Sequence, residues 1–291
     1  MISVYNSYWF LALVFISIII FFYILLKKGN TSTLFLLLAM IGAGFLIEAV
    51  IFAFLGSYTY YPNFVPDHPV YDSNLGAFVS NAFALPVIAT LIGTFRLKWI
   101  WMLLYAGIFV SIEWLFLKLN IYSHNWWRLE YTGLGLPFYF LTAKIIYKWI
   151  LGYSKGFKLN AVLYLMLISI TCSTHIIPIL FFSNRIYRPG WFDNQERDTI
   201  AFAVLFFLCS SLYYCIIAKL NWKKEWPKYA LTGLLTYTVN QLLLVAGILQ
   251  SLVWWDQFYY VGMSLLLILL TGIINKRLSM IHYEYNVNKC K

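Results

Sequence analysis

The sequence predicts an all-α protein, a polytopic membrane helical bundle with about nine transmembrane helices. Hydrophobic residues make up 62% of the 291 residues and charged residues only 11%, whereas soluble domains carry about 25% charged residues. Apolar runs long enough to cross a bilayer recur along the whole chain. Basic residues gather in alternate loops between these runs. We therefore expect one integral membrane domain over residues 1–291.

The nine expected spans follow from the length of the apolar runs. A membrane helix needs about 20 predominantly apolar residues. Nine segments meet this requirement, roughly 9–26, 33–55, 76–95, 99–118, 131–151, 159–182, 199–218, 230–251 and 258–274. The signal is weakest for the ninth segment.

The distribution of basic residues predicts the orientation. Of the 21 Lys and Arg residues, 15 fall in one alternating set of loops and five in the other, and Lys144 lies within a span. Because cytoplasmic loops are enriched in Lys and Arg, the N-terminus is expected outside and the C-terminus in the cytoplasm. The location implied is a cell membrane, of the bacterial cytoplasmic type. The net charge of +10 then reflects this loop bias, and no nucleic-acid partner is expected.

Four polar residues lie at membrane depth, on four different predicted spans. An ionisable side chain in hydrocarbon costs about 2.5–3.5 kcal/mol and usually faces a cavity or a partner. At 1.5 Å per residue, Glu48 and His175 lie roughly 10 Å below the outer ends of their spans. Asn81 and Glu113 lie about 8 Å below theirs.

This shared depth predicts one outward-facing polar pocket in the outer half of the membrane. Its expected lining is Glu48, Asn81, Glu113 and His175, with Tyr58, Tyr60 and Tyr61 at the mouth. Two neighbouring carboxyl groups hold one proton between them. Glu48 and Glu113 are therefore the candidate catalytic residues, one as general acid and the other as base or cation stabiliser.

Each of these residues also has a structural interpretation. In this alternative, Glu48 and Glu113 each hydrogen-bond a neighbouring helix and stabilise the packing of the bundle. The same holds for Asn81, for His175 as a satisfied core histidine, and for the neighbouring pair at 240–241 in the eighth span.

Two long outer loops carry further candidates. The loop over residues 56–76 contains three prolines and is interpreted either as a lid over the pocket or as an ordered cap. In the loop "SNRIYRPGWFDNQERD", acids and bases balance, which favours internal ion pairs. If Arg185 and Arg188 face the pocket instead, they are candidate ligands for a phosphate or carboxylate headgroup.

The sequence offers no sign of a metal or cofactor site. The four cysteines form no C-x-x-C pair, and three of them fall inside apolar runs, where a cysteine behaves as a small hydrophobic residue. No phosphate-binding loop, serine-hydrolase elbow, zincin motif or dinucleotide fingerprint is present. We expect neither cofactor nor metal.

Two resemblances add expectations. The stretch "WMLLYAGIFVSIEWLFLKLNIYSHNWWRLEYTGLGLPFYFLTAKIIYKW", within residues 76–150, resembles an uncharacterised family of multi-span membrane proteins of low-GC Gram-positive bacteria, which implies topology. The stretch "IEAVIFAFLGSYTYYP" around Glu48 is similar to lycopene-cyclase-like and carotenoid-hydratase-like membrane proteins. That likeness implies that Glu48 protonates an isoprenoid double bond.

Three hypotheses for function follow. The first is an intramembrane enzyme with terpene or carotenoid cyclase-like or hydratase-like activity on an isoprenoid or another lipid. The second is a proton-coupled transporter, which the absence of a clear internal repeat in the sequence disfavours. The third is a non-catalytic membrane scaffold or sensor. Expected partners are membrane lipids and a hydrophobic small-molecule substrate.

Overall fold

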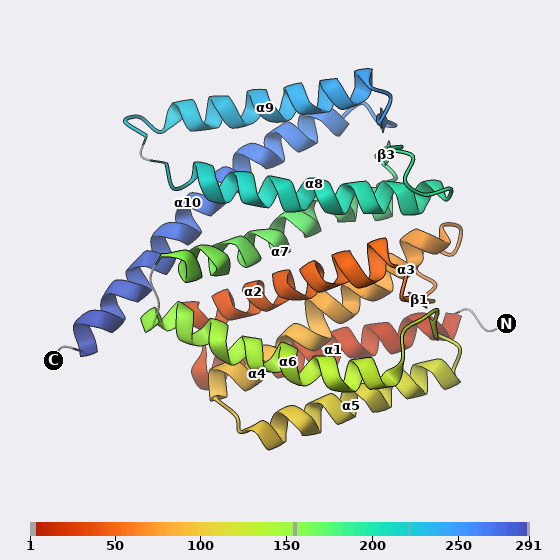
Figure 1. Cartoon of the computed structure of the whole chain (residues 1–291), viewed down its shortest axis with the longest axis vertical. Coiled ribbons are helices and arrows are strands. Elements are labelled where there is room, and N and C mark those ends of the chain that lie inside the picture. The colour runs from red at the N-terminus through yellow and green to blue at the C-terminus, as the bar shows by residue number, and fades with distance from the viewer. Residues whose placement is uncertain (1–3, 154–155, 221, 290–291) are drawn as a thin grey trace.

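The structure, a computed structural model, describes residues 4–153, 156–220 and 222–289. Within this part of the chain it is an all-α bundle of helices that run side by side (Figure 1). The helical rods are α1 Val4–Lys28, α2 Thr31–Glu48 with η1 Ala49–Phe54, α3 Pro69–Val79 with η2 Ser80–Ala84 and α4 Leu85–Phe95, α5 Trp99–Lys118, α6 Leu129–Lys148 with η3 Trp149–Tyr153, α7 Phe157–Phe182, α8 Gln195–Ile217, α9 Trp226–Val245 and α10 Asp256–Lys289.

Two small antiparallel sheets close one end of the bundle. Strand β1, Tyr58–Tyr60, pairs with β2, Tyr122–His124. Strand β3, Arg185–Tyr187, pairs with β4, Leu249–Ser251. Figure 1 shows β1 and β3 at the same end of the molecule, which is the predicted outer end.

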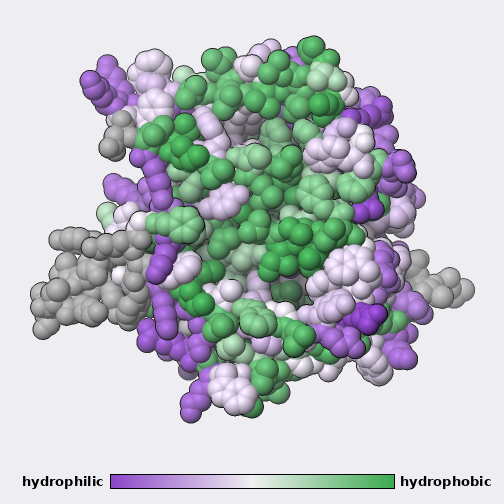
Figure 2. Space-filling view, in the orientation of Figure 1, coloured by the Kyte–Doolittle hydropathy of each residue, from purple (hydrophilic) through white to green (hydrophobic). Residues whose placement is uncertain are grey.

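The surface fits a multi-pass membrane protein. Apolar side chains form a broad band between two hydrophilic rims at the ends of the bundle (Figure 2). Within the described residues, eight helical rods are long and apolar enough to cross a membrane. Helix α9 is the rod that falls below this threshold, and the predicted ninth span, inside α10, lies above it. The exact number of crossings and their orientation stay predictions.

The helix boundaries correct two expectations from the sequence. The predicted loop over 56–76 is shorter than expected, because helix α3 begins at Pro69. Proline is favoured in the first turn of a helix, where its missing N–H has no partner to lose. The predicted span 230–251 is also too long at its end, since α9 stops at Val245 and β4 follows.

The chain contains an internal repeat that was not evident in the sequence. The order helix, strand, helix, helix, strand, helix runs from α2 through β1, β2 and α6, and again from α7 through β3, β4 and α10. Left-handed backbone recurs at matching places: Gly56 corresponds to Ser183, and Asn120 to Gly247. Each pair is 127 residues apart, as 183 minus 56 shows.

Backbone hydrogen bonds recur at the same interval. The Tyr61 N–H donates to the Ile121 carbonyl, and the Arg188 N–H donates to the Ile248 carbonyl. These bonds extend β1 and β3 in the same way toward the strand that each one pairs with. The two sheets are therefore built on one plan.

The loops after β1 and β3 are also closed alike. The Asp72 carboxylate accepts three backbone N–H groups, from Asn63, Phe64 and Val65. The Asp198 carboxylate likewise accepts three, from Gly190, Trp191 and Phe192. In both copies the hydroxyl side chain after the aspartate, Ser73 or Thr199, accepts the N–H of a strand tyrosine.

The two copies point the same way, because both sheets lie at one end of the bundle (Figure 1). Helix α1 stands outside the repeat. The copies meet through α2 and α7, the first helix of each copy. At this contact Gly42 lies so close to Leu165 that an added Cβ atom would overlap the Leu165 carbonyl oxygen. Glycine permits such a close approach of two helices.

Candidate functional site

A cavity of about 210 Å³ lies inside the first copy, near the β1–β2 end. Helices α1, α2, α5 and α6, the segment η2 and both strands contribute to its wall. The wall is largely apolar and aromatic, and two carboxylic side chains interrupt it. The polar and aromatic lining includes Glu48, Asn81, Glu113, Tyr58, Tyr60, Tyr122, Trp127, Tyr131, Thr132 and Tyr139.

Glu48 is held by two donors on one oxygen. The Tyr58 hydroxyl donates to Oε1 over 2.5 Å, and the Asn81 Nδ2 donates to the same atom over 2.7 Å. The second oxygen, Oε2, is buried and has no hydrogen-bond partner among the residues that the structure describes. The carboxyl group is thus fixed in orientation and keeps one oxygen unoccupied in the wall of an apolar cavity.

Local helix geometry positions these side chains. Glu48 is the last residue of α2, and the π-helical segment η1 begins directly after it. Asn81 lies inside the second π-helical segment, η2. A π-helical turn rotates the residues that follow it relative to a regular α-helix, and such turns are frequent at functional sites. Gly44, beside Asn81, leaves room for the amide, since a Cβ there would lie 3.1 Å from Asn81 Oδ1.

Glu113 reaches the same cavity from α5. Its Oε1 lies 2.7 Å from Nε2 of His124, and both side chains are mostly buried. Within the β1–β2 pair, Tyr58 is the direct partner of His124. The sheet therefore places the residue that holds Glu48 opposite the residue that holds Glu113.

An aromatic cluster lies between the two acids. The Tyr60 and Tyr122 ring centroids are 4.7 Å apart, and Tyr58 packs on Tyr122 at 5.3 Å and on Trp127 at 5.7 Å. Burial raises the pKa of Tyr60 well above its ordinary value, and nearby Glu48 and Glu113 raise it further. Both carboxyl groups therefore lie close enough to the Tyr60 hydroxyl to affect its pKa.

The structure brings together five of the seven residues predicted for the pocket. Glu48, Asn81, Glu113, Tyr58 and Tyr60 all line the cavity. The catalytic role of the two acids stays a prediction.

The remaining two residues lie elsewhere. Tyr61 is 41% exposed and its hydroxyl bonds to Ser123, next to the sheet and away from the cavity wall. His175 does not line this cavity, which corrects the prediction of a single pocket. It belongs to the second copy, where it occupies the position that Glu48 holds in the first.

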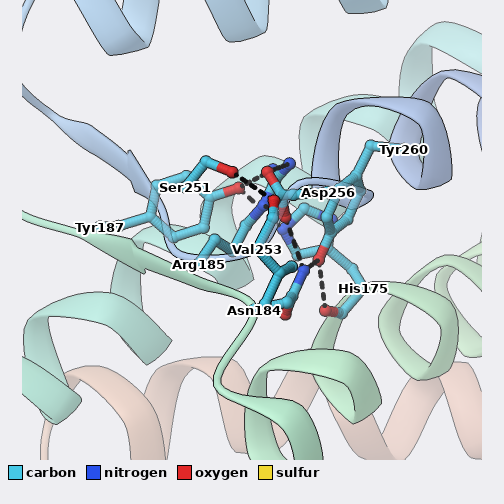
Figure 3. A network of polar contacts seen from close by, with 8 residues as sticks. All are labelled: His175, Asn184, Arg185, Tyr187, Ser251, Val253, Asp256 and Tyr260. Atoms are coloured by element: carbon cyan, nitrogen blue, oxygen red, sulfur yellow. Dashed lines mark hydrogen bonds and ion pairs between the residues drawn. The ribbon is translucent and has the colours of Figure 1, made fainter.

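Arg185, a candidate headgroup ligand only if it faced the pocket, is held in an internal ion pair instead. Its guanidinium is fully buried and makes two hydrogen bonds to the Asp256 carboxylate, at 3.0 and 2.8 Å. Figure 3 shows this ion pair enclosed by Asn184, Tyr187 and Tyr260. Ion pairing did occur as the charge balance indicated, but with a partner from the far end of the chain. Arg188 is exposed and bonds to Gln195, so its headgroup role stays a prediction.

Sequence reasoning missed several residues of the site. His124, Tyr122 and Trp127 come from the stretch "YSHNWW" between α5 and α6. That stretch stood out for its aromatic content, but interfacial belts explain such residues equally well. Only the pairing of β2 with β1, whose partner residues come 62 to 66 positions earlier in the chain, reveals that they face Glu48 and Glu113.

A second cavity, of about 260 Å³, lies inside the second copy. Its wall comes from α7, α8, α9 and α10, the helices that correspond to those around the first cavity. His175 Nε2 lies 3.1 Å from the Tyr187 hydroxyl, and its ring stacks on Phe206 at 4.9 Å. Among the residues that the structure describes, no group of three His, Cys, Asp or Glu side chains is arranged to hold a metal ion.

Comparison of the chain with protein families, with characterised proteins and with solved structures found no match. The class of protein that fold and surface define is a multi-pass helical protein compatible with a membrane.

Proposed function

We propose that this protein is an intramembrane enzyme that uses Glu48 and Glu113 for acid–base chemistry on a double bond of an isoprenoid or another unsaturated lipid. One observation carries the proposal. The Oε2 atom of Glu48 is buried and unpartnered in an apolar cavity that a second carboxyl group also lines. A carboxyl group shielded from water in this way favours its neutral form, which is the form that can donate a proton.

The first step is protonation of the alkene. Glu48 transfers its proton from Oε2 to one carbon of the double bond, and the positive charge develops on the other carbon. Tyr58 and Asn81 hold the carboxyl group in place during the transfer, since both donate to Oε1. The faces of Tyr58, Tyr122 and Trp127 stabilise the cation, as aromatic rings do for positive charge.

The second step discharges the cation. Glu113, oriented by His124, takes a proton from a carbon next to the cation and leaves an isomerised alkene. If a second double bond of the same chain first attacks the cation and closes a ring, the new cation loses a proton to Glu113 in the same way and leaves a cyclised alkene. Alternatively a water molecule adds to the cation and loses a proton to Glu113, which leaves an alcohol. In each route Glu48 gives one proton and Glu113 receives one, so the enzyme regains its starting state after exchange with water.

Lipid extracts of producing cells test this proposal. The full chain is expressed in a bacterial host that accumulates a linear isoprenoid, and membrane extracts are compared by liquid chromatography and mass spectrometry. Wild type is expected to yield a product isomeric with the precursor or heavier by one water. Glu48→Gln and Glu113→Gln should lower its formation by about 10²–10⁴-fold, the usual contribution of a positioned acid or base.

Ser111→Ala provides the matched control. Ser111 lies on the same helix as Glu113, but its hydroxyl donates to the Gly107 carbonyl of its own helix. Product formation should be unchanged. If wild type converts neither isoprenoids nor other unsaturated membrane lipids, the enzyme proposal fails, and a non-catalytic scaffold or sensor becomes the better explanation.

One observation favours a transporter as the second candidate. Parallel repeats occur in several transporter folds, with the substrate site at the interface between the repeats. Here, however, the two described cavities lie inside the copies, and the interface is closed by the contact between α2 and α7 at Gly42. Solute flux in proteoliposomes that Glu48→Gln abolishes would favour the transporter over the enzyme.

A further inference from the structure

We propose that the second cavity is a binding site for the uncharged hydrocarbon chain of a lipid, which enters from the bilayer between α8 and α9. The proposal concerns a site separate from Glu48 and Glu113, and it does not depend on the enzyme function. It rests on the chemistry of the cavity wall, on the location of the opening and on the internal repeat.

The wall of the second cavity carries no charged side chain among the described residues. A cation beside the lining residue Tyr260, Arg185, is neutralised by Asp256 and covered by the Tyr260 ring, whose centroid lies 3.3 Å from the guanidinium carbon. A charged headgroup would lose its hydration in the cavity and gain no counter-charge, which is unfavourable by several kcal/mol. The cavity therefore suits an uncharged chain.

Four of the hydroxyl groups in the wall are already occupied. Thr171, Thr174 and Ser210 each donate to a carbonyl of their own helix, as does Ser264. They therefore offer no free donor to a ligand, and contacts with the wall are mainly nonpolar. The volume of about 260 Å³ is below the usual range of about 300–1,000 Å³ for a whole ligand. It accommodates one segment of a chain while the rest stays in the bilayer.

The opening faces the hydrocarbon region. Two lining residues are exposed, Cys209 of α8 and Leu235 of α9. Cys209 lies about 14 residues, or roughly 21 Å, from the outer end of α8. Helices α8 and α9 are joined by a hydrogen bond between Tyr213 and Thr232 and otherwise make few contacts. The opening is thus deep in the apolar band, where lipid chains are the surrounding solvent.

The repeat explains why this cavity is open. In the first copy, α1 contributes Phe10 and Leu13 to the wall, and Phe10 packs on Phe116 of α5. Helix α1 has no counterpart beside α9, which lies at the edge of the bundle (Figure 1). The face that a helix covers in the first copy is therefore left to lipid in the second.

Photolabelling of the full chain in phospholipid nanodiscs tests the site. Two probes identify the source of the chain: geranylgeraniol with a terminal diazirine, and phosphatidylcholine with a diazirine at the end of one acyl chain. After irradiation, labelled peptides are mapped by mass spectrometry. We expect adducts on the facing sides of α8 and α9, around Cys209 and Leu235. The probe that labels more strongly identifies the preferred chain.

A cavity-filling variant distinguishes the site from bulk lipid. Thr236→Phe places in α9 the residue that Phe109 provides at the corresponding position of the first cavity. It should reduce labelling near Cys209 about tenfold, equivalent to ~1.4 kcal/mol. Leu234→Phe is the matched control, because Leu234 is 65% exposed on the same helix and does not line the cavity.

Two results would overturn the proposal. One is equal labelling of all lipid-facing helices, unaffected by Thr236→Phe. The other is labelling confined to the first cavity. Cys209→Trp, which narrows the opening, repeats the test if Thr236→Phe does not fold. Glu48→Gln should leave labelling at the second cavity unchanged, so failure of the enzyme proposal and failure of this site are separate outcomes.

Discussion

The two copies of the repeat share one backbone plan but treat charge in opposite ways. In the first copy Glu48 keeps an unpartnered oxygen beside a cavity that Glu113 also lines. At the position of Glu48 the second copy has His175, which bonds to Tyr187 and stacks on Phe206. At the position of Glu113 it has Asn240, and among the described residues no Asp, Glu, Lys or Arg lines the second cavity.

The supporting strands show the same divergence. Tyr58 of β1 corresponds to Arg185 of β3. Tyr58 donates a hydrogen bond to a carboxyl group of the cavity wall, whereas Arg185 forms a buried ion pair with Asp256 (Figure 3). The first copy therefore leaves ionisable groups available to a ligand, and the second uses its charges for structure. A reaction site is expected in the first copy, and a passive site in the second.

Among the substitutions considered, the largest difference in the free energy of unfolding is expected between variants of Arg185 and of Tyr58, the corresponding residues of β3 and β1. Arg185→Leu leaves the Asp256 carboxylate buried with the Asn184 amide as a donor but without its counter-charge, which should lower the free energy of unfolding by about 3–5 kcal/mol. Tyr58→Phe removes one hydrogen bond and should cost about 1–2 kcal/mol. Thermal unfolding in detergent, followed by circular dichroism, measures both. Equal losses would contradict a structural role confined to the second copy.

The contact between the copies should be sensitive to one methyl group. Gly42→Ala places a Cβ atom against the Leu165 carbonyl, which forces α2 and α7 apart and should cost about 1–3 kcal/mol. Gly107→Ala is the control, since its Cβ would meet nothing within 4 Å. Unfolding of both variants in the same detergent makes the comparison. If Gly42→Ala is as stable as wild type, the copies are not held by this close approach.

Replacement of Asn240 is expected to raise the free energy of unfolding, in contrast to the substitutions above, and by a smaller amount. The amide nitrogen and oxygen of Asn240 are buried and have no hydrogen-bond partner in the described part of the chain. Replacement by an apolar residue removes that desolvation penalty, so Asn240→Leu should stabilise the protein by about 1–2 kcal/mol. Asn81→Leu, which deletes a donor to Glu48, should destabilise it. A loss of stability in Asn240→Leu would show that the amide has a partner in the membrane.

Alkaline pH should destabilise the first copy of the repeat more than the second. Burial raises the pKa of Tyr58, Tyr60 and Tyr122 well above the ordinary value of 10.0. Burial also raises the pKa of Tyr187, but Arg185 opposes that shift. The folded state retains tyrosine protons that the unfolded state loses, so the contribution of these tyrosines to stability is constant below pH 10 and falls as the pH rises above 10.

Phenylalanine variants distinguish the two copies in an alkaline titration. Tyr122→Phe should reduce the loss of stability above pH 10, and Tyr187→Phe should change it less. Circular dichroism and tyrosinate absorbance, recorded on the same samples, follow unfolding and ionisation together. A larger effect of Tyr187→Phe would place the alkaline sensitivity in the second copy.

The depth that His175 shares with Glu48, Asn81 and Glu113 had a different cause from the one inferred from the sequence. Glu48 and His175 share a depth because they occupy the same position in two copies, 127 residues apart, and not because they line one pocket. The repeat escaped notice because few side chains are retained. The pattern Tyr-x-Pro in "YYPNF" and "YRPGW", each followed by a carboxylate, is its visible trace.

The sequence by itself determined that this chain is a bundle of apolar helices, because hydrocarbon leaves the backbone no partner except its own helix. It also indicated Glu48 and Glu113 as exceptional, since charge at that depth is costly. Tertiary structure decided which polar groups meet. Pairing of β1 with β2 brings Tyr58 opposite His124, and the ion pair of Arg185 with Asp256 makes both charges unavailable to a ligand. Such contacts depend on strand register and helix rotation, which local sequence does not encode.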